Sequence, residues 1–172
     1  KSLLDKDIKT GLLGVGKGAN LVWMISSFDK RVSASCTVFS AGWDAYKNIY
    51  KYGTDNTLKE IDDERERWLA GIAPESYAKF ITAPMLYISS SNCKDTHMDR
   101  AYDTLSRIPE NVDTLCCISP RLSDAIDHKN TENITLFFKK YLLNEDIYIP
   151  KKPLINIGNE EGKAVITVNA DK

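Results

Sequence analysis

The feature that most constrains the fold is a cluster of three glycines near the start of the chain, within the segment Thr10–Ile25 (TGLLGVGKGANLVWMI). A short apolar run, Gly11–Val15, precedes the last two glycines and predicts a buried strand. The apolar run Ala19–Phe28 follows them and predicts a buried helix. The glycines therefore belong to a tight turn between a strand and a helix, where side chains would collide with both elements.

One kind of site with such a turn binds dinucleotides, and its pattern G-x-G-x-x-G/A is satisfied from Gly14 to Ala19. The pyrophosphate would lie on the N-terminus of the helix. This site also needs an acidic residue at the end of the next strand, to hold the ribose hydroxyls. The next predicted strand, Arg31–Phe39, has no acid at its end, and Asp44 comes too late. A nucleotide-binding module at the glycine turn is therefore the less favoured alternative.

The other kind of site is the nucleophile elbow, G-x-S-x-G, in which a strained turn presents an attacking serine between two glycines. Gly14 and Gly18 match the flanking glycines, and Gly16 stands where the serine belongs. The central residue of an elbow has a positive φ, which strains a serine but costs a glycine little. Glycine at this position therefore keeps the turn and removes the attacking oxygen.

Predicted strands and helices alternate from the glycine turn to Leu143. Beyond the second strand, the pattern predicts strands at Ala83–Ser91 and Asp113–Ser119 and helices at Met98–Ile108 and Asn130–Leu143. We expect Thr131 to cap the last helix. Residues 43–80 show no strand pattern and predict a helical, cap-like insert. This order predicts an α/β fold, with a parallel sheet of about four strands and flanking helices.

The last segment, 147–172, differs in character. It carries two prolines and then two alternating apolar segments, LINIG and AVITVNA, separated by the turn signal NEEG. We expect an extended linker and a β hairpin, which could open a further β-domain. The predicted domains are therefore residues 1–146, including the insert, and the tail 147–172.

From Gly11 to about Leu143 the sequence resembles the C-terminal half of an α/β-hydrolase. The closest likeness is to bacterial acyl hydrolases of the acetyl xylan esterase and PhoPQ-activated pathogenicity-related type. The resemblance rests on the elbow, the Trp-containing insert and the segments ANLVWMISSFDKRVSASCTVF, ITAPMLYISSSN, MDRAYDTLSRIP and LFFKKYL. It implies an α/β-hydrolase fold whose first four strands precede the elbow.

In that family a nucleophile on the elbow, an acid after the next-to-last strand and a histidine after the last strand form a triad. By resemblance these positions are occupied by Gly16, Cys93 and Asp124. Cys93 follows Asn92 where the family has Asn-Asp, and Asp124 opens Asp-Ala-Ile where the family has His-Gly-Ile. The resemblance therefore implies a degenerate triad. The leading interpretation is a ligand-binding or interaction scaffold that is not an active serine hydrolase.

An active ester hydrolase that uses other residues stays an alternative. Asp95 lies two residues after Cys93, and His128 lies four after Asp124, so both are candidate substitutes. Neither supplies a nucleophile at the elbow, so they would have only water to activate. A thiol–imidazole pair of Cys93 and His97 is a further candidate, although the thiol would lie on the wrong side of the pocket.

The pocket is predicted around the elbow. The backbone N–H of Lys17, after Gly16, would be an oxyanion donor, and its side chain could contact an anion. The insert would line the pocket with Trp43, Tyr46 and Trp68, although packing within the insert explains these aromatic residues equally well. We expect a small-molecule or acyl ligand, no cofactor and no metal.

Composition narrows the class of partner and compartment. The 172 residues carry a net charge of −1, so no basic surface for nucleic acid or an anionic membrane is expected. The four cysteines form no C-x-x-C pair and are interpreted as thiols rather than zinc ligands or disulfides. The chain opens on Lys1 rather than Met, so we interpret it as a processed product or fragment of a soluble protein, compatible with an upstream export signal.

The elbow strand would end the predicted four-stranded sheet, and an unpaired edge is open to another chain. We therefore expect this strand to be covered by an N-terminal half of the same protein, a second copy or a partner.

Overall fold

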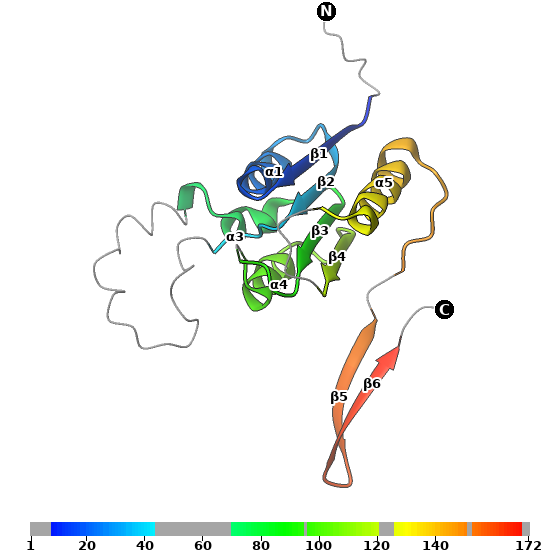
Figure 1. Cartoon of the computed structure of the whole chain (residues 1–172). Helices are drawn as coiled ribbons and strands as arrows, with labels where there is room; N and C mark the ends of the chain where they lie inside the picture. The colour runs from blue at the N-terminus through cyan, green and yellow to red at the C-terminus, as the bar shows by residue number, and fades with distance from the viewer. Residues whose placement is uncertain (1–7, 44–69, 95, 121–125, 151–152, 170–172) are drawn as a thin grey trace, which may run out of the picture.

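The computed structural model describes residues 8–43, 70–94, 96–120, 126–150 and 153–169 (Figure 1). Its centre is a parallel sheet of four strands in the order β1-β2-β3-β4. These strands are β1 (Thr10–Val15), β2 (Val32–Val38), β3 (Met85–Ser90) and β4 (Thr114–Ser119). The α/β class and the four-stranded parallel sheet predicted from the sequence are confirmed.

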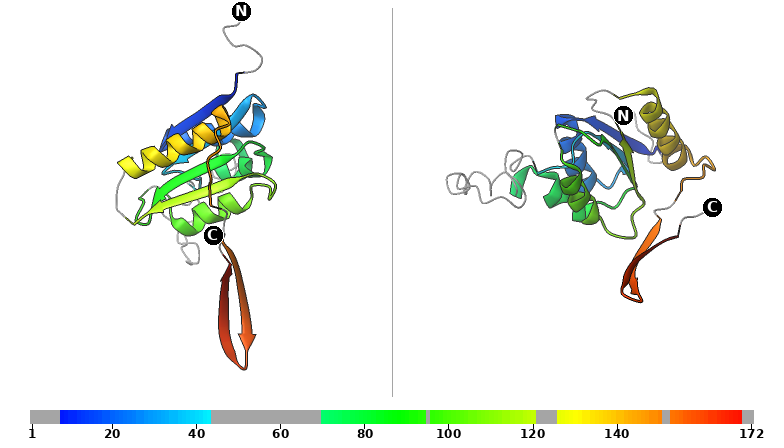
Figure 2. Two further views of the ribbon diagram at one scale, coloured as in Figure 1. Left: turned by 90° about the vertical axis from the view of Figure 1, so that its right-hand side faces the viewer. Right: turned by 60° about the horizontal axis from the view of Figure 1, so that its bottom comes forward.

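Helices cover both faces of the sheet (Figure 2). On one face lie α1 (Lys17–Phe28), α3 (Pro74–Tyr77), the short 3-10 helix η3 (Ala78–Phe80) and α4 (Met98–Ser106). Their core cluster includes Trp23, Ile81, Tyr87 and Leu105. On the other face lies α5 (His128–Leu143), whose Phe137 packs in a second cluster with Cys36, Leu86 and Ile88. Because β3 is covered on both faces, its residues are buried along its whole length.

The expectation that α1 is buried all round is wrong. Its side toward the sheet is buried, but Leu21, Ile25 and Phe28 are 58%, 43% and 69% exposed. A helix on an open sheet buries only the stripe that meets the strands. α1 therefore carries more apolar side chains than the described residues cover.

The predicted start of α5 is also wrong. The helix begins at His128 instead of Asn130, and Asp127 caps it by accepting a hydrogen bond from the backbone N–H of Asn130 at 2.8 Å. The hydroxyl of Thr131 donates to the Asp127 carbonyl at 3.0 Å and so lies inside the first turn. The Asp127 carboxylate, four residues before Thr131, takes the place of the expected cap because it accepts directly from a backbone N–H of the first turn.

The tail forms the predicted hairpin, with β5 (Leu154–Glu160) antiparallel to β6 (Lys163–Asn169). Both turn residues, Glu161 and Gly162, have positive φ values of 52° and 78°, as a type I′ turn requires. The hairpin stands apart from the four-stranded sheet (Figure 1). One of its faces carries four exposed apolar side chains, those of Ile155, Ile157, Ile166 and Val168.

Within the described ranges, no helix combines the length and the apolar character that a bilayer crossing requires.

Candidate functional site

The elbow lies at the carboxyl edge of the sheet, between β1 and α1. The Gly16 N–H donates to the Val38 carbonyl at 2.8 Å, which joins the turn to the end of β2. Gly16 has φ 55° and ψ −122°, so its φ is positive, as the elbow interpretation predicts. For a residue other than glycine this conformation costs about 1–3 kcal/mol.

Close packing between strand and helix requires a glycine at position 14. A Cβ there would lie 2.6 Å from the carbonyl carbon of Gly18 and 2.7 Å from Val22 Cγ2. A Cβ at Gly18, in contrast, would meet nothing within 4 Å, so the expectation that both flanking glycines avoid a collision holds only for Gly14. A Cβ at Gly16 would also meet nothing within 4 Å. Among the described residues, therefore, no atom fills the space beside the elbow position.

A buried polar contact holds α1 against the segment after β2. The Ser40 hydroxyl donates to Asn20 Oδ1 at 2.6 Å, and Trp23 Nε1 donates to the Ser40 carbonyl at 3.1 Å. All three residues are buried, and Trp23 is completely so. These hydrogen bonds fix the first two turns of α1, and with them the elbow, relative to the end of β2.

Cys93, which the resemblance predicts at the position of the triad acid, has apolar surroundings. Cys93 is buried in the cluster on the α5 side of the sheet, and its Sγ approaches the Phe39 carbonyl at 3.7 Å. Within the described residues no hydrogen bond joins Cys93 to His97, which instead precedes the first turn of α4. The thiol–imidazole pair is therefore not formed in this structure. The candidate substitute Asp95 lies outside the described residues.

Asp124, which the resemblance predicts at the position of the triad histidine, also lies outside the described residues. His128 is the first residue of α5 and is exposed. Across the described ranges its side chain makes no hydrogen bond or ion pair. The Ser119 hydroxyl donates to Asn130 Oδ1 at 3.4 Å, so the first turn of α5 lies beside the end of β4. His128 is therefore near the carboxyl edge of the sheet, without a contact that orients it.

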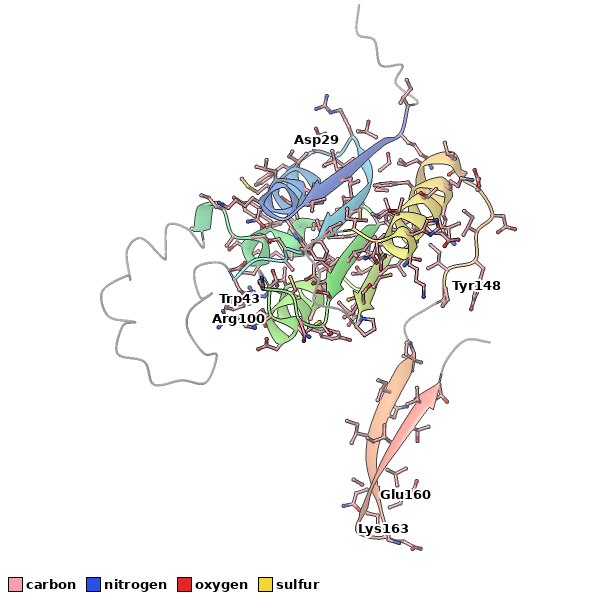
Figure 3. The ribbon with its side chains drawn as sticks, in the orientation of Figure 1. Asp29, Trp43, Arg100, Tyr148, Glu160 and Lys163 are labelled. Carbon is pink, nitrogen blue, oxygen red and sulfur yellow. The ribbon has the colours of Figure 1, made fainter. Side chains whose placement is uncertain are left out.

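Of the predicted pocket residues, Gly16, Lys17 and Trp43 are described, whereas Tyr46 and Trp68 lie outside the described residues. Lys17 is exposed at the start of α1. The backbone N–H of Trp43 donates to Glu75 Oε2 at 3.0 Å. The Arg107 guanidinium lies 5.4 Å from the centroid of the Trp43 ring. Through this contact with Arg107, the residue that follows the last turn of α4, Trp43 lies near the C-terminal end of α4, and Figure 3 shows its position.

Sequence reasoning missed two residues that shape this edge of the sheet. Phe39 has a φ of 63° directly after β2, and its carbonyl accepts from the Thr96 hydroxyl at 3.3 Å. Glu75 is only 3% exposed and holds the backbone of Trp43. A phenylalanine rarely has a positive φ, so the sequence did not indicate this conformation for Phe39. A single glutamate is usually exposed, so the sequence did not indicate the burial of Glu75.

A cavity of about 300 Å³ lies beside β4, on the face of the sheet that α5 covers, and the segment 147–150 completes its lining. Its lining is mainly apolar and includes Leu115, Leu136 and Tyr148. Neither the elbow nor Trp43 contributes to it, so it is separate from the predicted pocket. Within the described ranges, no group of three or more histidine, cysteine or acidic side chains is placed to hold a metal ion.

The four cysteines differ in exposure. Cys36 and Cys93 are buried, Cys117 is partly buried and Cys116 is exposed. Burial, with a smaller contribution from the nearby Cys117, raises the pKa of Cys36 to about 12, and burial also raises the pKa of Cys117. The folded state therefore binds the Cys36 proton more tightly than the unfolded chain does. The stability that this difference contributes is complete below pH 9.0 and is lost as the pH rises toward 12.

We expect iodoacetamide at pH 8 to alkylate Cys116 first and Cys36 only after unfolding, because the thiolate is the reactive form. Peptide mass spectrometry of the native and urea-unfolded chain measures this order. Equal rates for Cys36 and Cys116 in the native chain would contradict the burial of Cys36.

Comparison with solved structures shows an α/β-hydrolase-like fold. An acylaminoacyl peptidase bound to Z-Gly-Gly-Phe-chloromethyl ketone matches with a TM-score of 0.63 and 18% identity, over 84% of this chain and 25% of that protein. Acetyl xylan esterase 1 from Thermoanaerobacterium sp. JW/SL YS485 matches with a TM-score of 0.63 and 14% identity, over 79% and 46%. Acetyl xylan esterase from Paenibacillus sp. R4 matches with a TM-score of 0.63 and 13% identity, over 77% and 45%.

The chain thus spans a quarter to a half of the length of these proteins. No protein-family model and no curated protein sequence matches it. The structural likeness covers most of the chain, and at these identities it establishes the fold alone.

Proposed function

We propose that the chain is a catalytically degenerate member of the α/β-hydrolase fold that serves as a ligand-binding or interaction scaffold. The observation that carries the proposal is Gly16. Its backbone has the positive φ of an elbow, and a Cβ there would have free space, yet the residue has no side chain. Ordinary acyl-enzyme chemistry needs an attacking oxygen or sulfur at this point.

The environment of Cys93 supports the same proposal. A triad acid must be ionised and must accept a hydrogen bond from the histidine. Cys93 instead packs in an apolar cluster, and its Sγ approaches a backbone carbonyl. A buried thiol in such surroundings supplies neither the charge nor the acceptor.

The test is labelling with a fluorophosphonate probe together with hydrolysis of p-nitrophenyl acetate. We expect the unmodified chain to show no labelling and only the background rate of hydrolysis. In a Gly16→Ser variant the new side chain would meet no described atom, and the positive φ should cost about 1–3 kcal/mol, so circular dichroism must first show that the variant is folded. It should be labelled no faster than a Gly18→Ser control, because no base activates its hydroxyl.

Two outcomes would contradict the proposal. Turnover by the unmodified chain that survives in Gly16→Ala and disappears in His128→Ala would favour the active ester hydrolase. Strong labelling of Gly16→Ser alone would mean that an acid and a base are still in place. Thermal stabilisation by acyl esters would support a retained ligand pocket, whereas stabilisation by nucleotides would favour the nucleotide-binding alternative.

A further inference from the structure

The five residues directly after β2, 39–43, form a strained segment. Three of them have a positive φ: 63° at Phe39, 87° at Gly42 and 64° at Trp43. Glycine adopts this conformation at little cost, but phenylalanine and tryptophan are strained in it. Strain of this kind persists only where the surroundings hold the backbone in place. The contacts of the strained segment therefore determine whether it keeps this conformation.

The carboxylate of Glu75 holds the C-terminal end of the strained segment. Its Oε2 accepts from the backbone N–H of Trp43 at 3.0 Å, and the residue is only 3% exposed. A carboxylate accepts stronger hydrogen bonds than a neutral group does. The backbone of Gly42 passes so close that a Cβ at this position would collide with Oε2. Only a glycine at position 42 therefore leaves room for the carboxylate.

Arg107, at the end of α4, contacts both partners of this hydrogen bond. Its Nη1 donates to the backbone carbonyl of Glu75 at 3.2 Å, and its guanidinium lies 5.4 Å from the centroid of the Trp43 ring. An ion pair with Asp103 at 2.9 Å orients the guanidinium. The donor and the acceptor are thus positioned against the same residue of α4.

Two further elements bond to the middle of the strained segment. From α1, Trp23 Nε1 donates to the Ser40 carbonyl at 3.1 Å. From α4, the Thr104 hydroxyl donates to the Ala41 carbonyl at 2.6 Å. The strained segment therefore joins α1 to α4 and to α3, the helix that carries Glu75.

The N-terminal end of the strained segment lies at the elbow. The Val38 carbonyl, which accepts from the Gly16 N–H at 2.8 Å, belongs to the residue directly before Phe39. The Ser40 hydroxyl donates to Asn20 Oδ1 in α1 at 2.6 Å. A shift of the strained segment would therefore reach the elbow from two sides, through the end of β2 and through the first turns of α1.

We propose that Glu75 is a latch that holds the strained segment and couples Trp43 to the elbow. While Oε2 accepts from Trp43, this residue keeps its left-handed backbone. When the carboxylate is removed, Trp43 relaxes to a negative φ, and the strained segment shifts its hydrogen bonds to α1. Coupling between two places in a protein needs an element with two arrangements, and the strained and relaxed forms of the segment are these arrangements.

Hydrogen exchange of the full chain, measured at single amides by NMR, tests the latch. In Glu75→Ala we expect the Trp43 amide to exchange at least about tenfold faster, because a hydrogen bond to a carboxylate is lost. The amides of Gly16 and Ala19 should also exchange faster, by a smaller factor. All three should accelerate more than the amides of β3. The control Glu132→Ala, at an exposed glutamate of α5, should change none of them.

The conservative variant Glu75→Gln separates the latch from simple packing. Its amide oxygen can accept from the Trp43 N–H in the same place, although without the charge. We therefore expect faster exchange than in the unmodified chain and slower exchange than in Glu75→Ala.

Gly42→Ala opens the latch from the other side. The new Cβ would take the place of Oε2, which is the end of a flexible side chain and can turn away. The Trp43 amide should then accelerate as it does in Glu75→Ala. Because both substitutions remove the same hydrogen bond, the double variant should exchange much more slowly than the product of the two single effects predicts.

Three outcomes would overturn the proposal. Unchanged exchange at Trp43 in Glu75→Ala would mean that the carboxylate does not hold this residue, as would independent effects of Gly42→Ala and Glu75→Ala. Faster exchange at Trp43 with unchanged Gly16 and Ala19 would refute the coupling to the elbow. If Glu75→Ala does not fold, Glu75→Gln and Gly42→Ala provide the same readouts. Amide exchange needs neither a ligand nor an active site, so these results are independent of the proposed function.

Discussion

Replacing Gly14 by alanine is expected to destabilise the chain by about 3 kcal/mol, the upper range for overpacking. The new Cβ would lie 2.6 Å from the carbonyl carbon of Gly18, which belongs to the backbone of α1. A flexible side chain could turn aside, but here the strand and helix must separate. Separation also disturbs the hydrogen bonds of Trp23 and Asn20 with Ser40, which lie in the next turn. Urea unfolding monitored by circular dichroism measures the loss.

Gly18→Ala is the matched control, because the same change two residues later meets open space. Alanine is favoured over glycine in a helix, so we expect no loss of stability and a gain of up to about 1 kcal/mol. Equal destabilisation by the two substitutions would refute the close approach at Gly14.

The second large effect is expected from Trp23→Ala, which should cost about 3–5 kcal/mol. Trp23 is completely buried in the cluster with Ile81 and Tyr87, so its removal leaves a large cavity. The substitution also removes the donor to the Ser40 carbonyl, which lies 3.1 Å from Nε1. Because α1 carries the elbow, the loss should also loosen the turn at Gly16.

Trp23→Phe separates packing from hydrogen bonding. It keeps most of the apolar volume and removes the donor, so we expect it to cost clearly less than the alanine substitution. Urea unfolding of both variants, with hydrogen exchange of the Gly16 and Ala19 amides, measures the two effects. If Trp23→Ala is tolerated within about 1 kcal/mol, Trp23 does not anchor α1.

The order of strands and helices was predictable from the sequence because local patterns determine it. The strand, glycine turn and helix around Gly16 follow from one short segment, and the hairpin follows from two alternating runs around a turn. The exposure of α1 was not predictable in this way. Its residues 21, 25 and 28 are apolar, as in a buried helix, and only the arrangement of the other elements determines that they are exposed.

The candidate site was predictable in part, and for the same reason. The positive φ of Gly16 follows from the spacing of the glycines, and the structure has it. The contacts of Phe39 and Glu75 depend on segments that are far apart in the sequence, so no local pattern indicated them. The cap of α5 shows the same limit at short range, because Thr131 was the expected cap, whereas the Asp127 carboxylate accepts the hydrogen bond in the structure.

The contacts between β1 and α5 have a consequence for how this unit can be connected. Lys9 bonds to the Tyr141 carbonyl and to Asn144, and Gly11 lies against Phe138 and Leu142, so the first strand and the last helix of the sheet domain end side by side. Chain segments that precede residue 9 and follow residue 144 are therefore held next to each other where they meet the sheet.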